Sequence, residues 1–410
     1  MILIHLLTLW LPVWWPGLIL GVVVAAYSAY WAISMGYGLV KVAAKGDPPD
    51  PRDPEDLPYI SIIIPARDEA GVLPRTVSAL ESLRYPRDRM EVIFAEDGSR
   101  DNTLEILRSL ASGRSWMKVR HVEGAGSKAA AMNRVLEEAK GDLIYVLDAD
   151  AIPEPDALIK VASLYKSGAK AIVGRYAVAN AGESAVSRMV VLEELAWHVM
   201  CEGRSWLSLP CPPPAGSNYA VDRELLIRIG GFREGALAED AMLVSSLVRA
   251  GVRPKYSGVV ALVSAPTTLR GLFRQRVRWY RGYLEAMAES LRGLRRSADK
   301  AGMLDVALLF SSPAFAALGL ADLVANAWMA PWAAMAAAGA AAATLALWAY
   351  MRYLGGYYGR SSGVAAFLVP YALLTSAISA VAVALHVVRA RKTWHREAHS
   401  PRVDRAWHLE

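Results

Sequence analysis

The sequence predicts an α/β domain with a mainly parallel sheet, joined to an α-helical transmembrane domain. The 410-residue chain is 54% hydrophobic, which is high for an ordinary soluble protein. Its apolar residues concentrate at 1–43 and 303–388, whereas 46–300 has a mixed composition. Within that middle part, apolar runs alternate with amphipathic ones, and this alternation is typical of a parallel, Rossmann-like sheet.

The first segment, residues 1–43, is predicted to be a transmembrane anchor. Its run at 18–40 is long enough to cross a bilayer, and no Lys or Arg precedes it as in a secretory signal. The first basic residues, Lys41 and Lys45, follow the run, so the positive-inside rule predicts a cytoplasmic catalytic domain. The proline-rich residues 44–57 are predicted to be a linker.

The α/β domain is predicted to cover residues 58–265. Runs of β-branched and other apolar residues predict strands at 59–66, 91–97, 142–150 and 169–175. Amphipathic runs between and after them predict helices at 70–83, 100–110, 127–140 and 154–165. The run at 142–150 is apolar on both faces, which suits a strand covered on two sides.

Residues 266–300 are predicted to form interfacial amphipathic helices, and 301–389 a transmembrane region. The apolar candidates are 303–325, 329–351 and 363–388. Three crossings here would put the basic tail, 390–410, outside the cell, against the positive-inside rule. Three spans in the whole chain are therefore favoured, with 303–325 the weakest because it contains Asp305, Pro313 and Asp322.

The net charge of +6 favours a lipid bilayer over nucleic acid as the partner, because the basic residues cluster beside the apolar segments. Cys201 and Cys211 are predicted to be free thiols. Gln occurs once and Asn is sparse, which indicates either a thermophilic source or a GC-rich coding bias.

Four carboxylate-bearing stretches mark the α/β domain: 65–69 (PARDE), 95–101 (AEDGSRD), 147–150 (LDAD) and 237–240 (LAED). The first three end predicted strands, so their side chains should meet at the carboxyl edge of the sheet, where open α/β sheets bind ligands. Each stretch alone is equally typical of a turn. Their combination in this order indicates a functional site.

Together with SKAAAMN at 127–133 and QRVRW at 275–279, these stretches resemble the motifs of membrane-bound family 2 glycosyltransferases of the inverting GT-A type. The resemblance covers residues 58–282. Members of the family that the chain resembles are cellulose synthase, hyaluronan synthase and dolichyl-phosphate mannose synthase. The chain looks most like a minimal, cellulose-synthase-like archaeal mannosyltransferase. One departure is Glu96, which stands where the family has Asp.

The resemblance implies a nucleotide-sugar donor and a Mn²⁺ or Mg²⁺ ion held by Asp150, with Asp148 on the ribose or on the metal through water. Asp97 is expected to contact the base. The residues expected to bind the donor are Pro65, Arg67, Glu69, Asp97, Lys128, Asp148, Asp150, Gln275, Arg278 and Trp279. Lys128 is expected either beside the diphosphate or as a solvated helix start, because the spacing of a phosphate-binding loop is not met.

Asp240 is the candidate general base for an acceptor hydroxyl. Glu239 and Trp279 are expected to bind the acceptor. The alternative is that Glu239 and Asp240 only cap a helix. If 269–282 is helical, Gln275, Arg278 and Trp279 share one face. The neighbouring arginines are expected at the membrane surface: Arg274, Arg276 and Arg281.

The predicted function is inverting transfer of a sugar to a lipid-linked acceptor of the polyprenyl or dolichyl phosphate type. GDP-mannose is the preferred donor, and UDP-glucose and UDP-N-acetylglucosamine stay open. The alternatives are a processive polysaccharide synthase that uses a UDP-sugar, and a membrane protein that binds a nucleotide sugar without catalysis.

Overall fold

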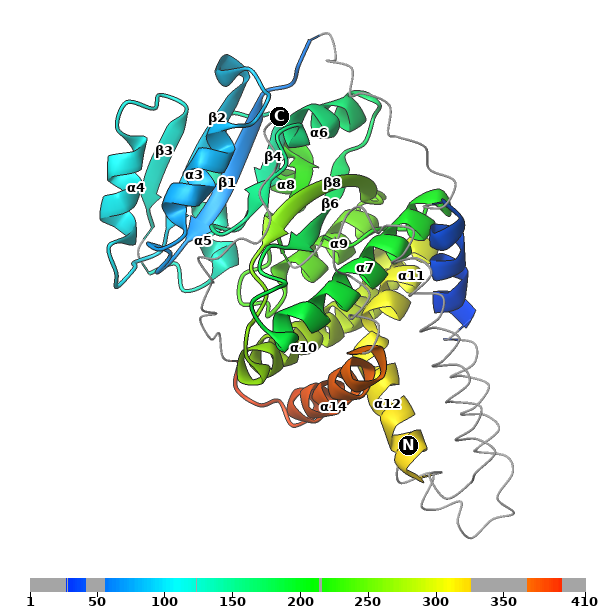
Figure 1. The fold of residues 1–410 in the computed structure, drawn as a ribbon. Helices are drawn as coiled ribbons and strands as arrows, with labels where there is room; N and C mark the ends of the chain where they lie inside the picture. The colour runs from blue at the N-terminus through cyan, green and yellow to red at the C-terminus, as the bar shows by residue number, and fades with distance from the viewer. Residues whose placement is uncertain are drawn as a thin grey trace.

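The computed structural model describes residues 27, 29–41, 56–122, 124–213, 216–325 and 367–392. Most of the predicted anchor and linker, the candidate span at 329–351 and the tail from 393 lie outside the described residues. An eight-stranded sheet is covered by helices on both faces, and a helical region lies below it (Figure 1).

The strand order is β3-β2-β1-β4-β7-β6-β8-β5. Strands β3, β2, β1 and β4 are parallel, as are β6 and β8, whereas β7 is antiparallel to β4 and β6, and β5 to β8. The mainly parallel α/β sheet is thus confirmed. The strands are β1 (Ile60–Ala66), β2 (Met90–Glu96), β3 (Met117–His121), β4 (Leu143–Val146), β5 (Ile152–Pro153), β6 (Ala171–Val178), β7 (Tyr219–Asp222) and β8 (Lys255–Val263).

All four predicted helices of the α/β domain are present, and the segment 269–282 is helical as expected. A further helix runs through 29–41. The other helices are α3 (Leu73–Glu81), α4 (Thr103–Ala111), α5 (Lys128–Leu136), α6 (Ala157–Lys166), α7 (Ala185–Trp206), α8 (Arg223–Arg228), α9 (Glu239–Arg249), α10 (Leu269–Gly293), α11 (Lys300–Phe310), α12 (Ser312–Ala325) and α14 (Leu368–Val387), with single 3₁₀ turns at η1 (Arg87–Arg89) and η2 (Leu294–Arg296).

The isoleucines of β1 alternate between two hydrophobic cores because successive strand residues point to opposite faces. Ile62 and Ile64 pack on the face covered by α3 and α6, and Ile63 packs on the face covered by α5 and α9. Each is fully buried and contributes about 1.5–3 kcal/mol to folding. This double burial keeps the central strands rigid where the site begins.

The predicted strand at 142–150 is too long. Strand β4 ends at Val146, and the next residues form the turn that carries Asp148 and Asp150. Four further strands were not expected: β3, β5, β7 and β8. β3 is half polar, β5 has two residues, and Gly258 in β8 adopts a φ of +71°, which weakens a strand pattern.

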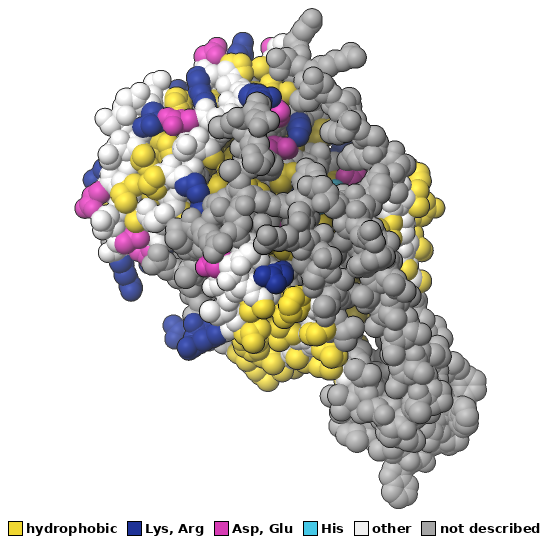
Figure 2. All heavy atoms as spheres, viewed as in Figure 1, with side chains coloured by type: hydrophobic (Ala, Val, Ile, Leu, Met, Phe, Trp, Pro, Cys, Tyr) yellow, Lys and Arg dark blue, Asp and Glu magenta, His cyan; other side chains and the backbone are white. Residues whose placement is uncertain are grey.

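Among the described residues, α14 has one apolar window long enough to cross a bilayer, Pro370–Val387. The candidate at 303–325 is bent by 44° between α11 and α12, and would be a second span only if that pair counts as one. Three spans are therefore not supported by the described part of the chain. Figure 2 shows an apolar patch in the region where α14 lies in Figure 1. Leu373, Val381 and Val387 of this helix are exposed.

The helix at 29–41 packs closely on α7 through two glycines. A Cβ atom at Gly38 would lie 1.9 Å from the carbonyl oxygen of Val199, so only glycine fits. Nearby, the Tyr30 hydroxyl donates to Asp305 Oδ1 at 2.9 Å, and the buried Arg204 guanidinium pairs with the same carboxylate. This segment is thereby joined to α7 and α11.

Candidate active site

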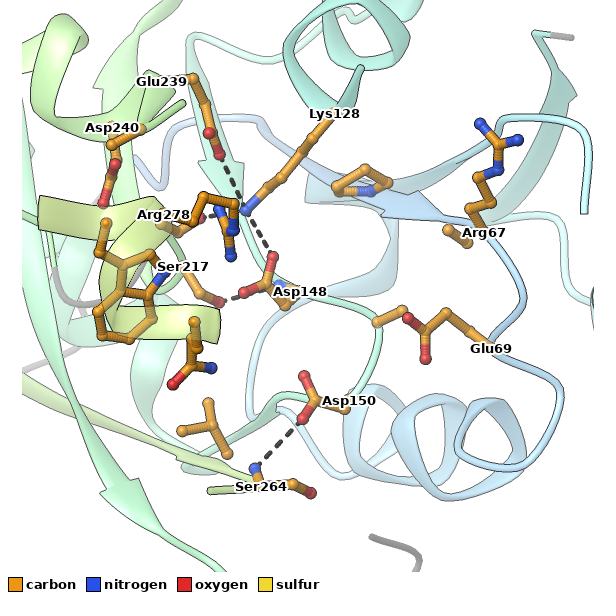
Figure 3. Close-up of a pocket in the computed structure, with 18 of the residues that line it drawn as sticks. Arg67, Glu69, Lys128, Asp148, Asp150, Ser217, Glu239, Asp240, Ser264 and Arg278 are labelled. Atoms are coloured by element: carbon orange, nitrogen blue, oxygen red, sulfur yellow. Dashed lines mark hydrogen bonds and ion pairs between the residues drawn. The ribbon is translucent and has the colours of Figure 1, made fainter. Parts of the chain in front are cut away.

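A cavity of about 670 Å³ opens at the carboxyl edge of β1, β2 and β4, next to α9 and α10 (Figure 3). Every site residue predicted from the sequence lines it: Pro65, Arg67, Glu69, Asp97, Lys128, Asp148, Asp150, Glu239, Asp240, Gln275, Arg278 and Trp279. Side chains from residues 65–69 through 275–279 therefore line one cavity. The role of each residue stays a prediction.

Asp97 is held in place at the end of β2. Its Oδ1 accepts a hydrogen bond from the Ala125 amide at 2.9 Å, and its Oδ2 lies 3.2 Å from Arg67. Arg67 comes from the end of β1, and its side chain is half exposed to the cavity. A planar base could therefore meet a fixed carboxylate and a guanidinium on the same wall.

Glu96, the departure from the family motif, is fully buried beneath this wall. Its carboxylate accepts a hydrogen bond from the Ser99 amide and contacts His121 Nδ1, each at 2.5 Å. Burial alone would raise the pKa of Glu96, but these hydrogen bonds outweigh it and hold the pKa below its usual value. The longer side chain serves to fix the loop that precedes Ser99.

Asp148 and Asp150 lie on the turn after β4 (Figure 3). The Asp148 amide donates to Ser217 Oγ at 2.9 Å, and Asp150 Oδ2 accepts from the Ser264 amide at 3.2 Å. Burial raises the pKa of Asp148 to about 6, with Lys128 opposing this shift and Asp150 adding to it. Because two neighbouring carboxylates repel one another, this pair favours the arrival of a cation.

Lys128 opens α5 and joins the two halves of the site. Its Nζ lies 2.6 Å from Asp148 Oδ1, 3.2 Å from Glu239 Oε1 and 2.7 Å from the Gly216 carbonyl oxygen. The contacts to Asp148 and Gly216 are hydrogen bonds, and the contact to Glu239 is an ion pair. The partly buried ammonium group is thus oriented by protein oxygens, and its place beside a diphosphate stays a prediction.

Asp240 stands in the first turn of α9 and is 7% exposed. Its Oδ1 accepts from the Ala241 amide at 2.8 Å, while the helix N-cap is Ala238 and has no side-chain cap. Burial, and then the charge of Glu239, raise the pKa of Asp240 to about 7, against the lowering effect of Lys128. A carboxylate with a pKa near neutrality suits a general base.

Two of the arginines expected at the membrane surface are buried instead. Arg276 is 1% exposed and pairs with Glu193 at 2.9 Å, and Arg281 donates to the carbonyl oxygens of Ala390 and Arg391 beyond α14. A surface role for these two is wrong, because each is buried against a distant part of the chain. Arg274 is exposed as expected.

The cavity also contains residues that the sequence did not indicate: Arg100, Tyr176, Ser217, Ser264 and Tyr283. Tyr176 belongs to β6, and Ser264 follows β8 directly. Strands β6 and β8 reach the site only because β7 runs antiparallel between β4 and β6. Ser217 stands just before β7, so recognition of that strand would have revealed it.

The donor set fits a hard divalent cation shared with a ligand. Among the described residues no three His, Cys, Asp or Glu side chains are grouped to hold a metal alone. Asp148 and Asp150 supply carboxylate oxygens to the cavity, and Mg²⁺ or Mn²⁺ commonly completes such a pair with substrate phosphate oxygens.

Comparisons with known proteins agree with this arrangement. The chain is 31% identical over 234 residues to the probable glycosyltransferase YdaM of Bacillus subtilis, covering 56% of each. It is 28% identical over 255 residues to the β-monoglucosyldiacylglycerol synthase of a Nostoc species, covering 59% of this chain and 54% of that one. The chain thus spans about half the length of the curated relatives it matches.

The fold is similar to that of the mannosyltransferase PcManGT from Pyrobaculum calidifontis, solved with GDP-Man and Mn²⁺. The TM-score is 0.63 at 23% identity, over 91% of this chain and 100% of that chain. Residues 61–226 match glycosyl transferase family 2. The matched segment contains the carboxylates at the ends of β1, β2 and β4, so this part of the chain is similar to glycosyl transferase family 2.

Proposed function

We propose that this protein transfers a hexose, with inversion, from a nucleotide-diphosphate sugar to a lipid-linked acceptor at the membrane surface. The observation that carries the proposal is the cavity itself, in which Asp148 and Asp150 lie on one side, Asp240 on the other, and Lys128 bridges between. A donor diphosphate and an acceptor can thus occupy one enclosed space.

The donor side is suited to a diphosphate leaving group. Asp150, with Asp148 beside it, would hold Mn²⁺ or Mg²⁺, which when bound neutralises the charge that develops as the glycosidic bond breaks. Lys128 and Arg278 add positive charge from the protein. Asp97 and Arg67 would receive the base.

The acceptor side is suited to activation of a hydroxyl. Asp240 would remove its proton as the oxygen attacks the anomeric carbon from the face opposite the diphosphate, which inverts that centre. Trp279 lines the same cavity and offers an apolar surface beneath the acceptor. An acceptor phosphate would already be ionised and would not need Asp240.

GDP-mannose is the proposed donor, supported by the GDP-Man bound to the mannosyltransferase with the similar fold. The relatives named β-monoglucosyldiacylglycerol synthase support a lipid acceptor. The exposed apolar side chains of α14 support a membrane location. The 27% identity to poly-β-1,6-N-acetyl-D-glucosamine synthase of Staphylococcus aureus favours polymer synthesis as the second candidate.

The test is to incubate the purified protein and Mn²⁺ with a panel of GDP- and UDP-sugars, adding polyprenyl phosphate, diacylglycerol or no lipid. We expect GDP release from GDP-mannose and short labelled products that extract with lipid. Long water-soluble glycan made without lipid would instead identify a polysaccharide synthase. Donor binding without nucleotide release under every condition would identify a non-catalytic protein.

A further inference from the structure

A largely buried polar cluster joins three helices beside the cavity. It consists of Glu193 on α7, Arg276 on α10 and Tyr371 on α14. The Glu193 carboxylate accepts from Arg276 Nε at 3.0 Å, lies 2.9 Å from a second guanidinium nitrogen, and also accepts from the Tyr371 hydroxyl. The pairing satisfies a guanidinium that is almost completely buried.

Arg276 also fixes two residues that line the cavity. Its guanidinium carbon lies 4.1 Å from the centroid of the Trp279 ring, and it donates to the side-chain oxygen of Gln275. A guanidinium stacked on an indole restricts the rotation of that ring, and the stack holds only while the guanidinium is itself oriented. The orientation of Trp279 therefore depends on Glu193.

The third member, Tyr371, belongs to α14, a helix with much exposed apolar surface. Only 22% of the window Pro370–Val387 is buried, and Leu373 and Val381 face outward. In Figure 1, α14 lies below α10 and beside α12, and it contacts both. An exposed apolar helix surface of this kind is suited to lipid contact, so the membrane can set the position of α14.

We propose that Tyr371 and Glu193 are positioning residues, through which the lipid-contacting helix α14 holds Arg276 and Trp279 in the orientation that receives the acceptor. The meaning for catalysis rests on the proposed function of Trp279. Donor binding should depend on the cluster less than acceptor binding does, because Asp97 and Asp148 are held by Ala125, Arg67 and Lys128.

The first test does not require turnover. Hydrogen–deuterium exchange is measured on the full chain in lipid nanodiscs, in peptides that cover residues 272–282. Tyr371→Phe should increase exchange there several-fold, because the Glu193–Arg276 pair on which α10 depends loses its hydrogen bond from α14. The matched control is Ser379→Ala, which removes a hydroxyl of the same helix that bonds only locally, to the Thr375 carbonyl oxygen. Equal exchange in the two variants would overturn the proposal.

The second test separates acceptor from donor. Tyr371→Phe should raise the KM for the lipid acceptor about five- to tenfold, the effect of one lost hydrogen bond, with a smaller change in donor affinity. Glu193→Gln should cost more, and adding Tyr371→Phe to it should cost nothing further, because both act through one group. If the increases in acceptor KM of the two single variants multiply in the double variant, Tyr371 does not act through Glu193 and the proposal is contradicted.

The two proposals can fail separately. If the unmodified protein transfers no sugar while exchange in 272–282 responds as expected, the proposed function fails and the connection from α14 to Trp279 stands. If sugar transfer proceeds and Tyr371→Phe behaves like Ser379→Ala in both assays, the connection fails and the proposed function stands.

Discussion

Asp240 is buried beside a second carboxylate, that of Glu239. If Asp240 is the base, the rate of sugar transfer should therefore depend on pH near neutrality. The pKa of Asp240 is raised to about 7, and only the ionised form can accept a proton. With a hydroxyl acceptor, we expect kcat/KM to fall about tenfold per pH unit below pH 7 and to level off above it. The measurement is a pH–rate profile at constant ionic strength and saturating Mn²⁺.

The matched substitution is Asp240→Asn, which keeps the shape and removes the base. It should lower kcat by about 10² to 10⁴ while the donor Kd is retained. A loss below about threefold would refute the role as a base and favour direct transfer to a lipid phosphate, whose oxygen is already ionised.

Asp150 should be required for turnover at the donor side. Asp150→Ala removes a carboxylate from beside the expected diphosphate, and we expect loss of several kcal/mol of transition-state stabilisation, so that nucleotide release becomes undetectable. EDTA should have the same effect on the unmodified protein, with recovery on adding Mn²⁺. Full activity in EDTA would exclude the metal assignment.

At the scale of elements, Lys128 connects the first turn of α5 to the turn after β4 and to the first turn of α9. The charge of Lys128 lowers the pKa of Asp240. Lys128→Met should therefore shift the acidic limb of the pH–rate profile to higher pH. Lys128→Arg should retain most of the original profile. Lys166→Met, at an exposed lysine paired with Asp56, is the control and should leave the limb unchanged.

The sequence predicts the parallel half of the sheet and the donor side of the site well, because residues such as Ile62 and Asp97 belong to long apolar runs that end in polar turns. It does not predict β7, whose four residues are too few to show a period. Without β7, the sequence does not show that the strand direction reverses between β4 and β6, and so does not predict that Tyr176 lines the cavity.

Burial of charged side chains is also beyond local sequence patterns. Arg276 stands in a basic amphipathic segment and matches a surface arginine in every local respect. Its partners, Glu193 and Tyr371, are 83 and 95 residues away along the chain, so only tertiary packing reveals that it is buried. The site residues were predictable, but the residues that hold them were not.

At the scale of the molecule, the helix at 29–41 is expected to be a structural part of the α/β domain. Gly38→Ala would place a Cβ atom 1.9 Å from the Val199 carbonyl oxygen on α7, so the helices must separate. We expect a loss of about 2 kcal/mol or more in the free energy of unfolding, measured by thermal unfolding in detergent. Gly36→Ala, which meets no atom within 4 Å, should be neutral or slightly stabilising. Equal melting temperatures would show that the contact is dispensable.

The hydrogen bond between Tyr30 and Asp305 also bears on how the protein is made. These residues are 275 positions apart, so about 275 further residues must be synthesised before the earliest described helix can reach this partner. Contacts of such separation slow folding. Until Asp305 has been made, Tyr30 lacks this hydrogen bond, so the native packing of the helix at 29–41 on α11 forms late in synthesis.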